Sequence, residues 1–138
     1  MRRSQMASGH VGESLARVLI VDDDPSVVQT FARMLRLEGH EVLTALDADA
    51  AWVEIATSRP DGVLLDLRLG SLDALTFLRR LRAHEEHRDT PVAIVTGDYA
   101  VDPATADALR ELQAAVYFKP VWLQDLVEIT RRLIHRNE

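Results

Sequence analysis

The stretch that decides the fold is VLIVDDDP at residues 18–25. Its first half belongs to a continuous apolar run, which is typical of a strand buried on both faces of a parallel sheet. Its second half is acidic, and Asp24 followed by Pro25 is the pattern of a helix N-cap and a first helical residue. A buried strand that leads directly into a helix is the repeating unit of an α/β fold.

Four more units of this kind follow along the chain. The expected strands share short aliphatic runs and the expected helices share apolar residues at helical spacing. Strands are predicted at 17–21, 41–46, 63–67, 91–95 and 115–118, and helices after Asp24, after Asp47, around Ala74, from Pro103 and from Leu123. Because consecutive units connect by right-handed crossovers, they predict one doubly wound parallel sheet with helices on both faces. Such sheets bind their ligands at the carboxyl ends of the strands.

The composition of the chain excludes several classes of protein. Its 138 residues suit one domain, expected at 15–138 after a flexible tail at 1–14. With no cysteine, disulfide scaffolds and thiolate metal sites are excluded. The net charge of −6 disfavours binding to nucleic acid. The longest aliphatic run, residues 18–21, is too short to cross a membrane, and we expect a cytoplasmic location.

Polar residues punctuate the ends of the predicted strands. Asp22 and Asp23 end the first strand and Asp66 lies near the end of the third, while Thr96 and Lys119 close the last two. In a parallel sheet all five converge at one edge, where three carboxylates repel one another unless a hard dication such as Mg²⁺ joins them. Carboxylates, dication, ammonium and hydroxyl together predict a phosphoryl-transfer site, in which one carboxylate can be the nucleophile.

Simpler explanations account for only part of this pattern. Asp24 is best explained as a helix cap, and a single cap leaves Asp22 and Asp23 unexplained. Asp66 interrupts an aliphatic strand, where an unpaired carboxylate is costly to bury. Lys119 alone would be an ordinary surface lysine, so the joint placement carries the prediction.

A second group of potential metal ligands lies further along the chain. His84 and His87 are three residues apart, with Glu85 and Glu86 between them. Because residues 79–88 contain both arginines and glutamates, this stretch is better explained as a solvated face of mixed charge than as a metal site or a nucleic-acid patch.

Four segments resemble the receiver domains of two-component response regulators. They are VLIVDDDP (18–25), LLDL (64–67), IVTG (94–97) and FKP (118–120), and the resemblance covers about residues 16–136. It implies a flavodoxin-like receiver fold, with a five-stranded sheet in the order 2-1-3-4-5. Helices 1 and 5 would cover one face, and helices 2, 3 and 4 the other.

The resemblance also implies roles for the acidic residues. Asp66 matches the aspartate that accepts the phosphoryl group. Asp22 and Asp23 match the pair that binds Mg²⁺ together with Asp66, and the backbone carbonyl of Arg68 matches the further metal contact. Arg68 also lies two residues after the acceptor, as Asp98 lies two after Thr96, so we expect their side chains to pair across the mouth of the site.

The remaining site positions match the family with one departure. Thr96 matches the hydroxyl that bonds the phosphoryl group, and Lys119 the lysine that pairs with it, through a cis Lys119–Pro120 bond. The family usually has Phe or Tyr where this chain has Val116, and the neighbouring Tyr117 should point to the opposite side of the strand. Gly97 is expected to keep the entrance of the site small.

The resemblance implies a signalling module rather than an enzyme, with self-catalysed phosphoryl transfer and autodephosphorylation only. A sensor histidine kinase or phosphotransfer protein would be the donor. An output partner or a second copy would dock on helix 4, strand 5 and helix 5, without direct contact to nucleic acid or membrane.

Two alternative functions remain. One is a receiver-like module that only binds a partner, and the intact set of site residues argues against it. The other is a Mg²⁺-dependent phosphohydrolase with an Asp nucleophile. Such a hydrolase generally needs a second carboxylate two residues after the nucleophile, where this chain has Arg68.

Overall fold

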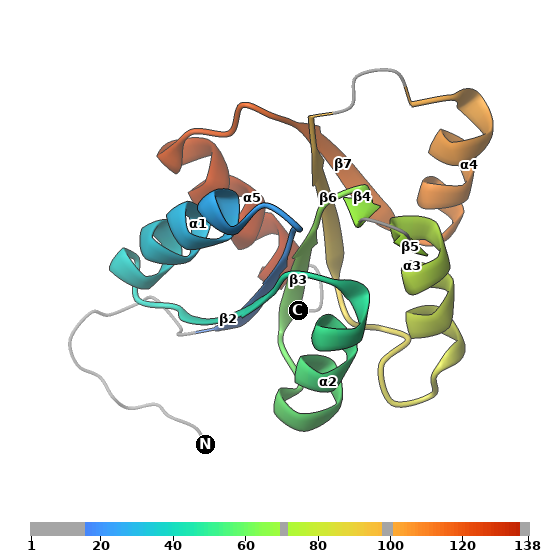
Figure 1. The fold of residues 1–138 in the computed structure, drawn as a ribbon, viewed down its shortest axis with the longest axis horizontal. Coiled ribbons are helices and arrows are strands. Elements are labelled where there is room, and N and C mark those ends of the chain that lie inside the picture. Colours follow the sequence, from blue (N-terminus) through green and yellow to red (C-terminus); the bar gives the residue numbers. More distant parts are fainter. Residues whose placement is uncertain (1–15, 70–71, 98–100, 136–138) are drawn as a thin grey trace.

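The protein is built on a parallel sheet of five strands (Figure 1). The structure is a computed structural model that describes residues 16–69, 72–97 and 101–135. The sheet has the order β2-β1-β3-β6-β7, which is the predicted order 2-1-3-4-5. Its strands are β1 (Arg17–Val21), β2 (Glu41–Ala45), β3 (Gly62–Leu65), β6 (Val92–Thr96) and β7 (Ala114–Phe118).

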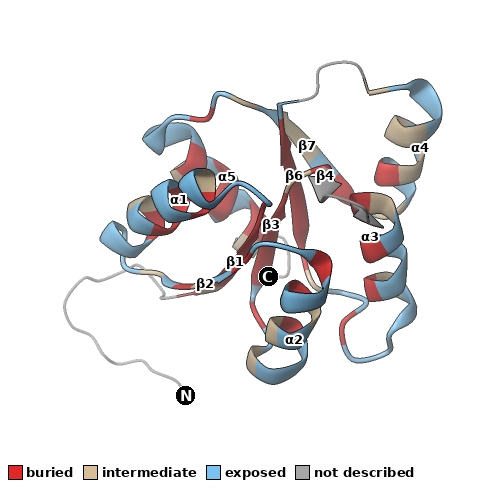
Figure 2. Cartoon of the chain, viewed as in Figure 1, coloured by how far each residue is buried: buried red, intermediate tan, exposed pale blue. Residues whose placement is uncertain are grey.

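Five helices cover the two faces of this sheet, as predicted (Figure 1). One face carries α1 (Pro25–Leu37) and α5 (Leu123–His135), and the other carries α2 (Ala48–Ser58), α3 (Ala74–Ala83) and α4 (Pro103–Glu111). Each face has its own apolar core, and the central strands are buried on both sides (Figure 2). Continuous aliphatic strands are the sequence counterpart of this double burial.

Aspartate caps start three of the helices close to the ends of the strands. The side chain of Asp24 accepts a hydrogen bond from the backbone N–H of Ser26 at 2.9 Å, and Asp47 caps α2 in the same way. Asp102 accepts from the N–H of Thr105 at 2.8 Å, which lowers the pKa of the Asp102 carboxyl. These caps confirm the predicted helix starts and leave Asp24 with a structural role.

One element was not predicted from the sequence. Strands β4 (Arg68–Leu69) and β5 (Leu72–Asp73) pair antiparallel as a short hairpin between β3 and α3. Strands of two residues are too short to show the alternation that marks a strand in sequence. The third strand of the main sheet accordingly ends at Leu65, two residues earlier than expected.

Within the described part of the chain, no helix combines the length and apolarity needed to span a bilayer. The longest, α1 and α5, have 13 residues each. A transmembrane helix needs about 20 predominantly apolar residues.

Gly62 offers a test of how tightly α5 packs on the sheet. A Cβ added there would lie 2.8 Å from Leu133 Cδ2 and 3.1 Å from its Cγ, and Leu133 is itself buried. We expect Gly62→Ala to lower the free energy of unfolding by about 1–2 kcal/mol, measured by urea denaturation. Gly97→Ala is the control, because the nearest atom to its Cβ is 3.9 Å away, and it should change stability by less than about 0.5 kcal/mol. Equal effects of the two substitutions would contradict this packing.

Candidate functional site

Two backbone hydrogen bonds place aspartates at the edge of the sheet. The N–H of Asp22 donates to the carbonyl of Ala45 at 3.2 Å, and the N–H of Asp66 donates to the carbonyl of Val21 at 2.9 Å. Both bonds continue the strand pairing just beyond β1 and β3. Asp22 and Asp66 therefore lie at adjacent strand ends, as the sequence predicts.

Three carboxylates meet at this edge. Asp22, Asp23 and Asp66 each offer an oxygen, and these oxygens lie within 4.8 Å of one another. The side chains of Asp22 and Asp66 are 6% and 12% exposed, whereas Asp23 is open to solvent. Mg²⁺ binds oxygen ligands at about 2.0–2.1 Å and retains waters, so two oxygens on one ion lie about 3–4 Å apart. The all-oxygen donor set and its concentrated negative charge therefore fit this ion.

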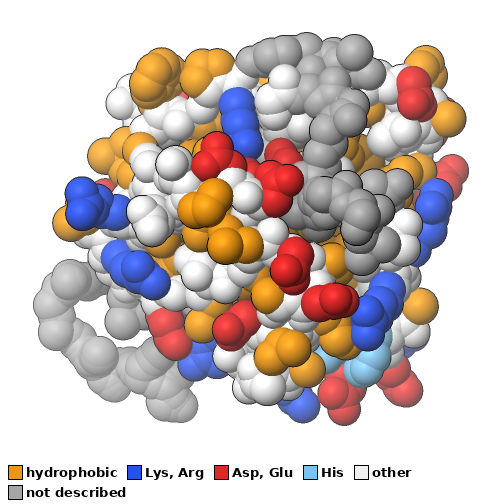
Figure 3. Space-filling view, viewed as in Figure 1, with side chains coloured by type: hydrophobic (Ala, Val, Ile, Leu, Met, Phe, Trp, Pro, Cys, Tyr) orange, Lys and Arg blue, Asp and Glu red, His pale blue; other side chains and the backbone are white. Residues whose placement is uncertain are grey.

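The ammonium of Lys119 lies between two of the carboxylates. Its Nζ donates a 2.8 Å hydrogen bond to Asp22 Oδ2 and lies 3.6 Å from Asp66 Oδ1. Burial alone disfavours the charged form, but the hydrogen bonds and charges of Asp22 and Asp66 outweigh it and raise the pKa of Lys119. Lys119 is therefore an ammonium throughout the neutral range. Figure 3 shows a basic side chain beside acidic ones on this face.

The direct bond between Lys119 and Asp22 was not predicted. The two residues are 97 positions apart, and no sequence pattern tells which carboxylate an approaching lysine will meet. The other oxygen of Asp22 accepts from the backbone N–H of Asp24 at 3.0 Å, so both oxygens of this buried carboxylate have partners. The predicted cis bond between Lys119 and Pro120 is confirmed.

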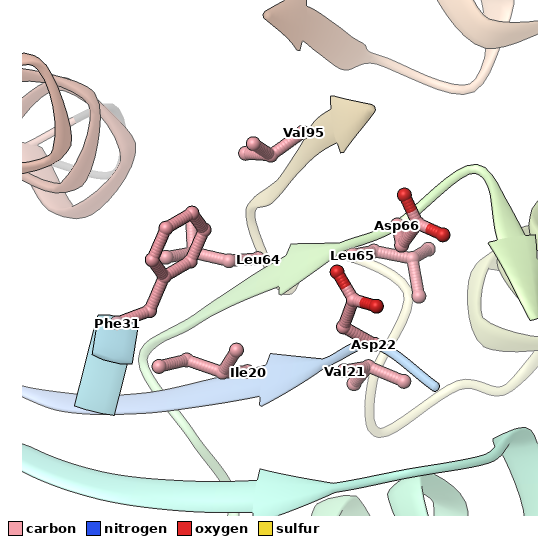
Figure 4. Close-up of a pocket in the computed structure, with 8 residues that line it drawn as sticks. All are labelled: Ile20, Val21, Asp22, Phe31, Leu64, Leu65, Asp66 and Val95. Carbon is pink, nitrogen blue, oxygen red and sulfur yellow. The ribbon is translucent and has the colours of Figure 1, made fainter. Parts of the chain in front are cut away.

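A small cavity lies beneath the carboxylates (Figure 4). Its volume is about 10 Å³, and apart from Asp22 and Asp66 its lining is apolar, with Ile20, Phe31 and Leu64 among its walls. A cavity of this size has room for one water molecule at most. A larger reactant can therefore approach Asp66 only from the rim and not from within the core.

The residues beside the site alternate across the sheet. Thr96 is buried at the end of β6, and the backbone N–H of Lys119 donates to its carbonyl at 2.8 Å. Val116 packs on the face of α2, α3 and α4, and Tyr117 packs on the face of α1 and α5. The predicted orientation of Tyr117 is thus confirmed. Gly97 is exposed, and its expected effect of keeping the entrance of the site small stays a prediction.

The predicted pair across the mouth of the site lies partly outside the described residues. The backbone of Arg68 pairs with Asp73 in the β4–β5 hairpin. Asp98 lies outside the described residues, so its pairing with the side chain of Arg68 stays a prediction.

Comparison with known proteins points to one family. The family model for the response regulator receiver domain matches residues 18–131. The transcriptional regulatory protein PrrA of Mycobacterium leprae is 37% identical over 127 residues, which are 91% of this chain and 53% of that protein. The chain thus spans about half the length of the curated relatives it matches first.

Solved structures give the same result for the fold. A CheY-like response regulator receiver domain protein from Methanospirillum hungatei superposes with a TM-score of 0.80 at 27% identity, covering 89% of this chain and 96% of the other. The chemotaxis response regulator CheY4 of Vibrio cholerae superposes with a TM-score of 0.78 at 25% identity, covering 87% and 99%. The similarity therefore extends over the whole sheet and its helices.

Removing the ammonium should expose the cost of a buried, unpaired Asp22. We expect Lys119→Met to lower the free energy of unfolding by about 1–3 kcal/mol in metal-free buffer. Arg110→Met is the matched control, because Arg110 pairs with Asp107 at the same 2.8 Å but both side chains are more than half exposed. Loss of that pair should cost less than about 1 kcal/mol. Similar losses in both variants, measured by urea denaturation, would show that burial of the Lys119–Asp22 pair has no energetic consequence.

Proposed function

The chain belongs to the response regulator receiver domain family, whose members act in phosphorylation-dependent signalling, and we propose that Asp66 is its phosphoryl acceptor. One observation carries this assignment. Asp66 lies at the rim of the sheet, 3.6 Å from the ammonium of Lys119, in a cluster with two further carboxylates. It is thus a carboxylate placed where an anionic group can be both attacked and neutralised.

In the proposed transfer the phosphodonor supplies the phosphoryl group and the solvent supplies the proton that the leaving group takes up. A carboxylate oxygen of Asp66 attacks the phosphorus and forms the new P–O bond, while the P–N bond of a donor phosphohistidine breaks. The electron pair of that bond leaves with the imidazole, which takes up a proton. Lys119 pairs with a phosphoryl oxygen, and the hydroxyl of Thr96, at the end of the neighbouring strand, donates to another. A sensor histidine kinase or a phosphotransfer protein supplies the donor.

The acidic cluster is proposed to hold Mg²⁺ during this transfer. Asp22, Asp23 and Asp66 would supply carboxylate oxygens. Arg68 would supply its backbone carbonyl, as the family resemblance implies. When bound, the ion neutralises negative charge on the transferring group. Lys119 contacts Asp22 and already lies within 4 Å of Asp66, so a small side-chain movement is enough for it to follow the phosphoryl group.

In the phosphorylated state, a partner or a second copy of the chain would bind the surface formed by α4, β7 and α5. In α4 the buried residue is Leu109, which anchors this helix to the core less firmly than its neighbours. Weakly anchored elements shift at low energetic cost. With Val116 at the family's aromatic position, Thr96 and the segment that follows it would carry the conformational change.

We propose that residues 15–138 form the receiver domain and that residues 1–14 form a tail before it.

A phosphohydrolase with its own organic substrate has less support. Arg68 stands where such an enzyme would need a second carboxylate. The cavity below Asp66 holds one water molecule at most, so an organic substrate would have to bind at the rim. Both observations favour a signalling module whose product is its own phosphorylated state.

The acceptor is tested by intact-mass measurement after incubation with acetyl phosphate and Mg²⁺. We expect one phosphoryl group on the wild-type chain, no label without Mg²⁺, and no label on Asp66→Asn. Asp24→Asn is the matched control, because it makes the same chemical change at a helix cap that asparagine also serves, and it should label like the wild type. Phosphoryl labelling of Asp66→Asn equal to that of the wild-type chain would contradict the assignment of Asp66 as the acceptor.

The metal role is tested by Asp23→Asn. Without metal, removal of one of three clustered charges should leave stability unchanged or raise it, by up to about 1 kcal/mol. In excess Mg²⁺, the wild-type chain should gain more in melting temperature than the variant, because an ion that binds only the folded state stabilises it by mass action. An equal gain in both chains would remove Asp23 from the metal site.

A further inference from the structure

A second group of ligand atoms lies at the opposite end of the sheet from the carboxylates. After α3 the chain turns towards β6, and the N–H of His87 donates to the carbonyl of His84 at 3.0 Å. The N–H of Thr90 then donates to the carbonyl of His87 at 3.1 Å. This turn brings the rings of His84 and His87 together, with their centroids 4.6 Å apart.

Glu86 completes this group. One ligand atom from each of His84, Glu86 and His87 lies within 4.8 Å of the others. Figure 3 shows histidine side chains at the surface among acidic and basic ones. The group includes two imidazoles, and its donor set therefore differs from that of the acidic cluster around Asp66.

The environment of His87 corrects the prediction that residues 79–88 form a solvated face of mixed charge. His87 is only 5% exposed, whereas His84 and Glu86 are exposed. The indole of Trp52, on α2, makes edge contacts with both rings, at 5.6 Å from His84 and 5.8 Å from His87. The guanidinium of Arg80 in turn lies 4.2 Å from the Trp52 ring. Trp52 thus forms an apolar wall that the sequence pattern of α3 alone could not indicate.

The ring of His87 offers a nitrogen atom to this group. Among the residues that the structure describes, none forms a hydrogen bond with its ring nitrogens. Burial, and then the neighbouring His84, lower the pKa of His87. An imidazole nitrogen is a common ligand for a transition metal.

We propose that His84, Glu86 and His87 bind Zn²⁺, with water completing the coordination. Imidazole nitrogen and carboxylate oxygen are common Zn²⁺ ligands, and three protein ligands plus water is a common set. Two ligand atoms on one tetrahedral Zn²⁺ lie about 3.3 Å apart, at bond lengths of about 2.0–2.1 Å. His84 and Glu86 therefore need to close inward on the fixed ring of His87, which their exposure allows.

The contacts that compete with the metal are weak. Glu86 pairs with Arg59 at 3.5 Å, and both side chains are at least 60% exposed. His84 Nδ1 accepts a long bond, 3.3 Å, from the backbone N–H of Glu86. A metal on Nδ1 of His84 takes the place of this hydrogen bond, and a metal on Nε2 leaves the ring proton on Nδ1, which then can no longer accept. The exposed ion pair between Glu86 and Arg59 contributes little to stability.

The experiment is a calorimetric titration of the untagged, metal-free chain with Zn²⁺ in excess Mg²⁺, so that the acidic cluster is occupied. We expect one Zn²⁺ per chain, with an affinity about tenfold or more weaker in His84→Gln and in Glu86→Gln, which removes the carboxylate. His135→Gln is the matched control, because it removes an exposed histidine of α5, and it should bind within twofold of the wild type. His84 is exposed, so its variant is expected to fold, and melting temperatures of all variants verify this.

Trp52 supplies a second readout in the same chain. In a Trp122→Phe background Trp52 is the sole tryptophan, and Ni²⁺ should quench its fluorescence, with the quenching lost in His84→Gln. Zn²⁺ affinity unchanged within twofold in His84→Gln, or quenching by Ni²⁺ that survives this substitution, would overturn the proposal. None of these readouts uses phosphorylation, so failure here leaves the role of Asp66 untouched, and the reverse also holds.

Discussion

The site depends on the packing of like charges at the end of a buried sheet. The parallel strands bring Asp22 and Asp66 side by side, and Asp23 adds a third negative charge. Within this cluster the ammonium of Lys119 is the described counter-charge, bonded to Asp22 and near Asp66. Three carboxylates and one ammonium leave this edge of the sheet with a net negative charge, which suits a dication. On the proposed function, a phosphoryl group would bring further negative charge to this edge, which a cation beside it would offset.

The two cores hold this charged edge in place. On one side Leu126, Ile129 and Leu133 of α5 pack against the sheet, and on the other Phe77, Leu78 and Leu81 of α3 do so. Because central strands such as β6 are buried along their full length, their backbone positions are fixed by packing on both faces. A site built on the ends of such strands needs no large rearrangement to form. Beside it, α4 is anchored through Leu109, and we propose this helix as the element that transmits a change of state.

Much of the fold and of the candidate site could be predicted because the signals are local. Aliphatic runs mark buried strands, and Asp24, Asp47 and Asp102 mark the helix starts that the structure confirms. The order of parallel strands then brings the polar strand ends to one edge. What the sequence could not indicate depends on tertiary contacts, as in the bond between Lys119 and Asp22 and the burial of His87. The β4–β5 hairpin was missed for a different reason, because two-residue strands have no period to detect.

The position of the covalent bond tests the account most directly. The chain would be phosphorylated with acetyl phosphate in Mg²⁺ and reduced with borohydride, which converts an aspartyl phosphate to homoserine, and then mapped by peptide mass spectrometry. We predict homoserine at position 66 alone, because Asp66 combines access from the rim with the ammonium of Lys119. Homoserine at Asp22 or Asp23, or a phosphorylated chain without homoserine at 66, would contradict the central claim.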